Sequence, residues 1–207
     1  MTALNFHISD DEICLVVDSL AISPQDGEPL VLLTKFIVLP HLGITATGTG
    51  HGQFLAEWFA RVRDGILAKD IDRVDQYTPS MLRTLAADHD LDVNSATVYH
   101  FGFSPRNNRF VAYVYRSTSG FTSERVDSGL GIKPQVEPPE GDVTYPAAFV
   151  EIMERQRNAD LQRPPAERIG IGGEIHCVHM QRSGFSVFTL HRFSSYDREY
   201  DAACQRL

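Results

Sequence analysis

The chain has 207 residues, of which 43% are hydrophobic and 22% are charged, a balance typical of one globular domain with a sizeable core. Acidic residues outnumber basic ones 27 to 19, for a formal net charge of −8, which argues against a phosphate backbone as the main partner. No apolar run approaches the roughly 20 residues of a membrane helix, and three cysteines without a C-x-x-C pair favour reduced thiols. We therefore expect a single cytoplasmic domain over residues 1–207 that binds neither nucleic acid nor membrane.

The first part of the chain predicts strands followed by helices. Apolar alternation and apolar runs bounded by turn residues predict four strands, at residues 3–8, 13–17, 30–39 and 42–47. From Gln53 to Leu67 the apolar residues recur at helical spacing, which predicts a helix. Thr78 as a cap and Pro79 in the first turn predict that a second helix begins there.

The rest of the chain returns to strands, with one helix between them. Strands are predicted at residues 98–103, 110–115, 174–180 and 185–193, and a short strand is expected after the Ser119-Gly120 turn. Lys133 to Asp142 is expected to be a loop, and Thr144 and Pro146 then open a helix. Residues 194–207 form a weakly patterned tail. This order predicts an α+β domain of two antiparallel sheets packed face to face, with helices on the outer faces.

Four features recur in order within the first 60 residues. They are Thr2, then Val16-Val17-Asp18-Ser19, then Thr34-Lys35-Phe36, then Thr47-Gly48-Thr49-Gly50 ahead of a helix. This ordered set resembles the proteasome β-subunit branch of the N-terminal-nucleophile (Ntn) hydrolases. The resemblance implies a four-layer αββα sandwich, hydrolysis of a peptide or a small amide substrate, assembly into a homo-oligomer and no cofactor. It leaves open whether an ATPase partner acts with the chain.

The same resemblance assigns roles to individual residues. A chain-terminal threonine supplies a nucleophilic hydroxyl and, as base, its own α-amino group, whose reference pKa is roughly 7.7–8.0. Thr2 would be this residue, Lys35 would lower the pKa of the amine by like-charge repulsion, and Asp18 would hold Lys35 in place. The Gly48 N–H would stabilise the oxyanion, and Ser128 resembles a supporting serine of the family.

The base requires a free amine at Thr2. A retained Met1 would turn the Thr2 amine into an amide nitrogen that cannot act as a base. Because the chain enters its first expected strand at residue 2 or 3, we expect removal of Met1 alone to expose the nucleophile, with no propeptide to shed.

Two positions depart from the family pattern. The aspartate and the serine that support the nucleophile ahead of a Gly-Gly pair fall on Arg168 and Ile171, and Glu167 replaces the aspartate only after a slip of one residue. These departures favour an alternative hypothesis, a catalytically inactive protein that keeps the fold as an assembly or binding module. In that case Asp18 and Lys35 are a structural pair or separate surface charges, and Ser128 belongs to an ordinary turn.

Other candidate sites are weaker. Gly48-x-Gly50-x-Gly52 suggests a dinucleotide loop, but its third glycine breaks the spacing of that motif. His176 and His179 lie three apart on a predicted strand, face opposite sides and make poor co-ligands for one metal. Cys14 and Cys177 are expected to be buried packing thiols. No metal site is predicted.

Overall fold

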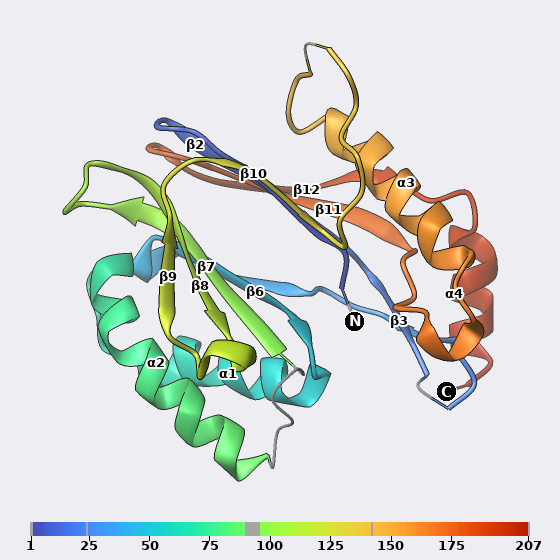
Figure 1. The fold of residues 1–207 in the computed structure, drawn as a ribbon, viewed down its shortest axis with the longest axis horizontal. Coiled ribbons are helices and arrows are strands. Elements are labelled where there is room, and N and C mark those ends of the chain that lie inside the picture. Colours follow the sequence, from blue (N-terminus) through green and yellow to red (C-terminus); the bar gives the residue numbers. More distant parts are fainter. Residues whose placement is uncertain (1, 24, 90–95, 142, 207) are drawn as a thin grey trace.

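The computed structural model describes residues 2–23, 25–89, 96–141 and 143–206. In these ranges the strands form three antiparallel sheets (Figure 1). The first sheet has the order β10 (Gly129–Lys133), β1 (Leu4–Ile8), β2 (Glu12–Asp18), β11 (Glu174–Gln181) and β12 (Gly184–Arg192). The second has the order β5 (Phe36–Leu39), β6 (Ile44–Gly50), β7 (Ala96–Ser104), β8 (Arg109–Arg116) and β9 (Ser123–Val126). The small sheet pairs β3 (Leu20–Ile22) with β4 (Pro29–Leu32).

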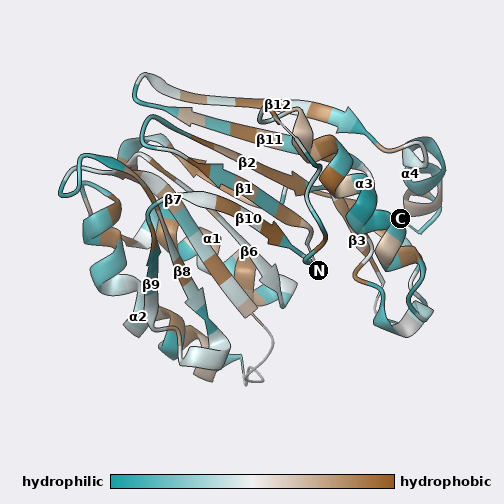
Figure 2. Cartoon of the chain, turned by 45° about the horizontal axis from the view of Figure 1, so that its top comes forward, coloured by the Kyte–Doolittle hydropathy of each residue, from teal (hydrophilic) through white to brown (hydrophobic). Residues whose placement is uncertain are grey.

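The two large sheets bury an apolar layer between them. Alternate residues of β1 and β2, such as Phe6 and Leu15, meet Phe101 and Phe110 of the second sheet in this layer. The Phe6 and Phe101 rings meet edge to face, with centroids 5.0 Å apart, a favoured aromatic geometry. Figure 2 shows the alternation of hydrophobic and hydrophilic residues along these strands. β1, β2, β7, β8 and β11 therefore each place one face in this shared core.

The helices are amphipathic and bury one face each. α1 (Gly52–Gly65) and α2 (Ile71–Asp88) pack on the second sheet, where Phe54 and Trp58 are fully buried. α3 (Ala148–Leu161) places Phe149, Ile152 and Met153 on the outer face of the first sheet. Among the described residues, no helix is both long and apolar enough to cross a membrane.

The predicted four-layer αββα sandwich, with helices covering both outer faces, is wrong. The chain forms a third, two-stranded sheet, and α4 (Tyr196–Cys204) packs against β4 of that small sheet (Figure 1). β12, at the edge of the first sheet, leaves the adjacent Val187 and Phe188 53% and 40% exposed. Adjacent residues of a strand face opposite sides, so neither side of β12 is fully covered. The architecture is therefore mainly antiparallel sheet with an incomplete helical cover.

Several predicted boundaries also change. The apolar run at residues 30–39 splits into β4 and β5, and β3 and β10 were not predicted. α2 begins seven residues before Thr78, because the Asp70 carboxylate caps it by accepting from Arg73 N at 2.9 Å. Pro79 lies inside this helix, where Thr78 Oγ1 donates to Val74 O. The predicted tail contains α4.

Candidate functional site

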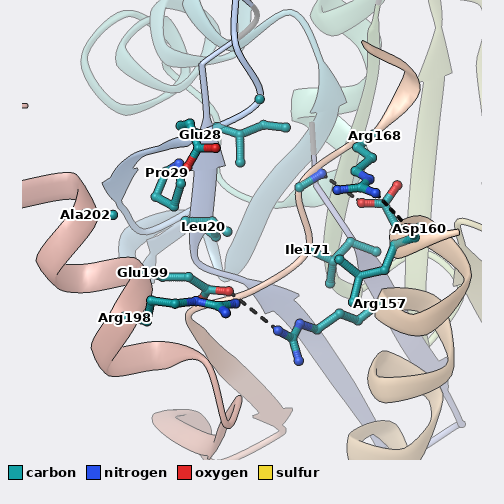
Figure 3. A pocket seen from close by; sticks show the side chains of 14 residues that line it. Leu20, Glu28, Pro29, Arg157, Asp160, Arg168, Ile171, Arg198, Glu199 and Ala202 are labelled. Carbon is teal, nitrogen blue, oxygen red and sulfur yellow. Dashed lines mark hydrogen bonds and ion pairs between the residues drawn. The ribbon is translucent and has the colours of Figure 1, made fainter. Parts of the chain in front are cut away.

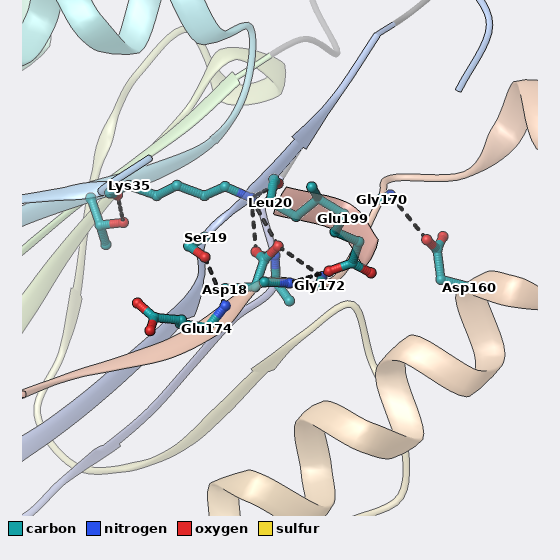
Figure 4. Close-up of polar contacts among 12 residues, drawn as sticks. Asp18, Ser19, Leu20, Lys35, Asp160, Gly170, Gly172, Glu174 and Glu199 are labelled. Carbon is teal, nitrogen blue, oxygen red and sulfur yellow. Dashed lines mark hydrogen bonds and ion pairs between the residues drawn. The ribbon is translucent and has the colours of Figure 1, made fainter. Parts of the chain in front are cut away.

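The site begins at Asp18, the last residue of β2, whose side chain is completely buried. Lys35 Nζ donates to both carboxylate oxygens at 2.9 Å, and the backbone N–H of Ala3 donates to Oδ1 at 2.9 Å. Gly172 N donates to Oδ2 at 3.4 Å. Figure 4 shows Lys35 and Gly172 on opposite sides of this carboxylate. A buried carboxylate needs such donors, so Asp18 ties three distant segments of the chain together.

Lys35 lies between β4 and β5, where the chain leaves one sheet for the next. Only 7% of the residue is exposed, and its ammonium also donates to Leu20 O at 2.5 Å. Burial lowers the pKa of Lys35, and the neighbouring Asp18 carboxylate opposes that shift. Burial likewise raises the pKa of Asp18, while Lys35 and two backbone amides act to lower it. The buried surroundings disfavour either charge on its own, and the hydrogen bonds between the two side chains hold them together.

Thr2 is placed next to this pair by its neighbour in sequence. Because Ala3 N is bonded to Asp18, the residue before it is fixed at the same end of β1. Thr2 is buried and lines a cavity of about 460 Å³ together with Lys35 and Gly48. It also lines a second cavity, of about 500 Å³, with Thr97 and Lys133. The structure therefore brings Thr2, Asp18, Lys35 and Gly48 together. Met1, on which the free amine depends, lies outside the described residues.

Gly48 lies in β6, under α1. A Cβ atom at this position would be 2.4 Å from Leu55 Cδ2 and 2.8 Å from Thr97 O, so only glycine fits. The nearby glycines do not form a dinucleotide loop, because β6 pairs antiparallel with β5 and β7 and that loop belongs to a parallel βαβ unit. Instead, His51 caps α1, with its Nδ1 accepting from Phe54 N at 3.2 Å. Gly50 and His51 line both cavities, and sequence reasoning missed His51.

Ser128 does not reach the site. It is exposed in the turn before β10, and the next residue, Gly129, pairs with Ile8 at the end of β1 away from Thr2. The predicted role of Ser128 beside the nucleophile therefore has no support in the geometry.

The two positions that depart from the family pattern have structural roles. Arg168 donates to the carbonyls of Leu161 and Arg163 at the end of α3, and Ile171 is buried in the core beneath that helix. Glu167 is exposed. None of these side chains supplies the missing aspartate or serine.

A buried carboxylate that the sequence did not reveal holds the Gly172–Gly173 turn. Glu199 of α4 accepts from Gly173 N at 2.7 Å and from Ser195 Oγ at 2.5 Å. Arg157 of α3 donates to Ser195 Oγ at 2.6 Å and lies 3.7 Å from Glu199. Arg157 and Glu199 line a cavity of about 410 Å³ between α3, α4 and the small sheet (Figure 3). Since Gly172 N is bonded to Asp18, Glu199 stabilises the turn that provides one of the hydrogen-bond donors to Asp18.

Replacing Glu199 with alanine is expected to lower the free energy of unfolding by about 2 kcal/mol, because Gly173 N and Ser195 Oγ lose a buried acceptor. Urea unfolding followed by circular dichroism measures the loss. Glu28, an exposed carboxylate on the same cavity, provides the control, since Glu28→Ala should change stability by less than about 0.5 kcal/mol. Equal losses in the two variants would contradict the supporting role of Glu199.

No protein-family model matches the chain, and no curated protein matches it. Function is therefore inferred from the arrangement of the site. Its central feature is a buried lysine–aspartate pair beside a threonine that borders two cavities.

Proposed function

We propose that this protein is an amide- or peptide-bond hydrolase that uses Thr2, as the first residue of its active form, as the nucleophile. The observation that carries the proposal is the buried Lys35–Asp18 pair next to Thr2 at the junction of two cavities. A lysine ammonium is rarely buried without such a task or a partner. The resemblance to the proteasome-like Ntn hydrolases provides the chemical scheme, and the sandwich architecture predicted with it is not part of the proposal.

In this scheme the α-amino group of Thr2 accepts the proton of its own hydroxyl. The oxygen then attacks the substrate carbonyl, and the Gly48 N–H donates to the oxyanion that forms. Collapse of this intermediate breaks the C–N bond, gives the amine product a proton and leaves an ester on Thr2. Attack by water on the ester releases the acid and restores the hydroxyl. The ammonium of Lys35 keeps the pKa of the Thr2 amine low enough for it to act as a base near neutral pH.

The cavity shared by Thr2, Lys35 and Gly48 favours an apolar group on the substrate. Its other lining side chains include Ile22, Leu33, Leu55 and Phe59. Burial of an apolar substrate side chain there would contribute binding energy in proportion to its area. Assembly into a homo-oligomer is a further prediction from the resemblance, which leaves an ATPase partner open.

A specific observation favours the alternative, a non-catalytic binding or assembly module. The helper positions expected beside the nucleophile are occupied by the buried Ile171 and by Arg168, which binds carbonyls elsewhere. Ser128 is at the far end of β1. In that reading the Lys35–Asp18 pair is a structural pair that fixes the ends of β1 and β2.

The two functions are separated by the reaction of Thr2 with an electrophile. The chain is prepared with Thr2 as its first residue, the terminus is confirmed by intact mass, and an electrophilic peptide probe directed at threonine is added. We expect an adduct on the wild type and none on Thr2→Ala. Thr49→Ala is the matched control, because Thr49 is another buried threonine on the second cavity and its loss should leave the adduct in place. Absence of a Thr2-dependent adduct would sink the hydrolase proposal.

A further inference from the structure

Three side chains of different chemistry meet on the outer face of the first sheet, away from Thr2. Glu12 and Cys14 are two apart on β2 and therefore share a face, and His179 of β11 pairs directly opposite Cys14. The ligand atoms of the three residues all lie within 4.8 Å of one another. Glu12 Oε2 and His179 Nε2 are 2.8 Å apart.

We propose that Glu12, Cys14 and His179 form a binding site for a divalent transition-metal ion of the zinc class. Zinc accepts sulfur, nitrogen and oxygen ligands at about 2.0–2.3 Å in a tetrahedral arrangement. Ligand atoms around such an ion are several ångströms apart, so only small side-chain shifts are needed. A set of one thiolate, one imidazole and one carboxylate selects zinc over magnesium or calcium, which prefer oxygen ligands.

Two of the three ligand side chains are partly exposed to solvent. The Cys14 residue is fully buried, whereas the side chains of Glu12 and His179 are 34% and 24% exposed. The sulfur thus forms the floor of the site, the other two ligands form its rim, and the fourth position is left for water. Three protein ligands plus water is a coordination found in zinc sites with an open position.

Metal binding would replace the proton on the Cys14 thiol and the contact between Glu12 and His179. Burial and the Glu12 carboxylate raise the pKa of the Cys14 thiol to about 11, so the metal ion must displace the thiol proton to form the sulfur–metal bond. The Glu12–His179 contact opens to admit the ion, and each group then donates a lone pair to the metal. The proton passes to solvent and no oxidant or reductant is involved.

The same sheet contains matched residues that lack part of this set. Cys177 is a second buried thiol on the same face of the sheet, outside the cluster. His176 Nε2 lies 3.0 Å from Glu174 Oε2, which makes a histidine–carboxylate pair outside the metal-site cluster. Cys14 is four residues from Asp18 along β2, roughly 13 Å, so the metal site is independent of the proposed hydrolase function.

Cobalt(II) provides a direct test, because a cysteine thiolate bound to cobalt gives a sulfur-to-metal charge-transfer band in the near ultraviolet. The full chain is stripped with a chelator and titrated with Co²⁺. We expect the band to saturate at one ion per chain and to disappear when Zn²⁺ is added. Cys14→Ser should abolish the band, whereas Cys177→Ser should keep it.

The two rim ligands are tested without disturbing a buried residue. Glu12→Gln and His179→Gln should each weaken Co²⁺ binding by at least roughly tenfold, the loss that even outer-shell changes commonly cause, and His176→Gln should not. Circular dichroism checks that each variant is folded. If Cys14→Ser does not fold, the Glu12 and His179 variants alone test the metal site. The proposal is overturned if the wild type gives no charge-transfer band, or if the control variants lose binding as much as the ligand variants.

Discussion

Asp18→Asn is expected to lower the free energy of unfolding by about 3–5 kcal/mol, the cost of removing one partner from a buried ion pair. Asparagine keeps the size of the side chain and still accepts from Ala3 N. The change leaves the buried Lys35 ammonium without its carboxylate, with Leu20 O as an uncharged acceptor. Urea unfolding of the folded variants, followed by the fluorescence of Trp58, measures the loss.

The double variant Asp18→Asn with Lys35→Met decides why stability is lost. Methionine fills the volume of lysine without its charge, so the double variant should recover most of the stability lost in Asp18→Asn. Under the proposed mechanism, labelling of Thr2 should not recover, because the ammonium that we propose lowers the pKa of the Thr2 amine is absent. Asp64→Asn is the control, since its partner Arg63 is solvent-exposed and such pairs contribute about 1 kcal/mol or less. A loss below about 1 kcal/mol in Asp18→Asn would mean that Lys35 is not held as a charged group by Asp18.

The sequence predicted β1 and α1 from their apolar periods and β2 from an apolar run bounded by turn residues. It failed where the decisive contact is distant. The run from Leu30 to Leu39 is apolar on both sides of Lys35, so it reads as one strand, although Lys35 turns inward to meet Asp18. The rule that places proline in a first helical turn misplaced the start of α2, because the Asp70 cap lies a full nine residues before Pro79.

The candidate site was predictable in part. Asp18 follows an apolar run, which indicates burial and the need for a partner, but only the family resemblance pointed to Lys35 as that partner. Glu199 was not predictable, because α4 buries little besides Glu199 and Ala203 and its apolar face is too narrow to register as a helical period. The same holds for Cys14 and His179, which are far apart in sequence and meet only through the register of β2 with β11.

His100 is expected to make the protein less stable as the pH falls below about 6.5. His100 lies on β7 and is completely buried. Its Nε2 accepts from the Trp58 indole N–H at 3.1 Å, and its Nδ1 has no hydrogen-bond partner among the described residues. Burial lowers the pKa of His100 from 6.5 to about 3, because an imidazolium would be a charge in an apolar core. The folded protein therefore keeps the ring neutral under conditions where the unfolded chain binds a proton.

The sign of the effect follows from that difference in bound protons. Stability contributed by a neutral His100 is fully present above pH 6.5 and is lost between that value and about 3, at about 1.4 kcal/mol per pH unit. At pH 4.5 the loss should reach about 3 kcal/mol relative to pH 7.

His100→Gln keeps an acceptor for Trp58 and should lack this part of the pH dependence, whereas His41→Gln, which changes an exposed histidine, should keep it. Trp58 is the only tryptophan and stacks on His100 with centroids 5.7 Å apart, so its fluorescence reports unfolding of this region at each pH. If the wild type and His100→Gln lose stability in parallel from pH 7 to pH 4.5, His100 is not held neutral in the core.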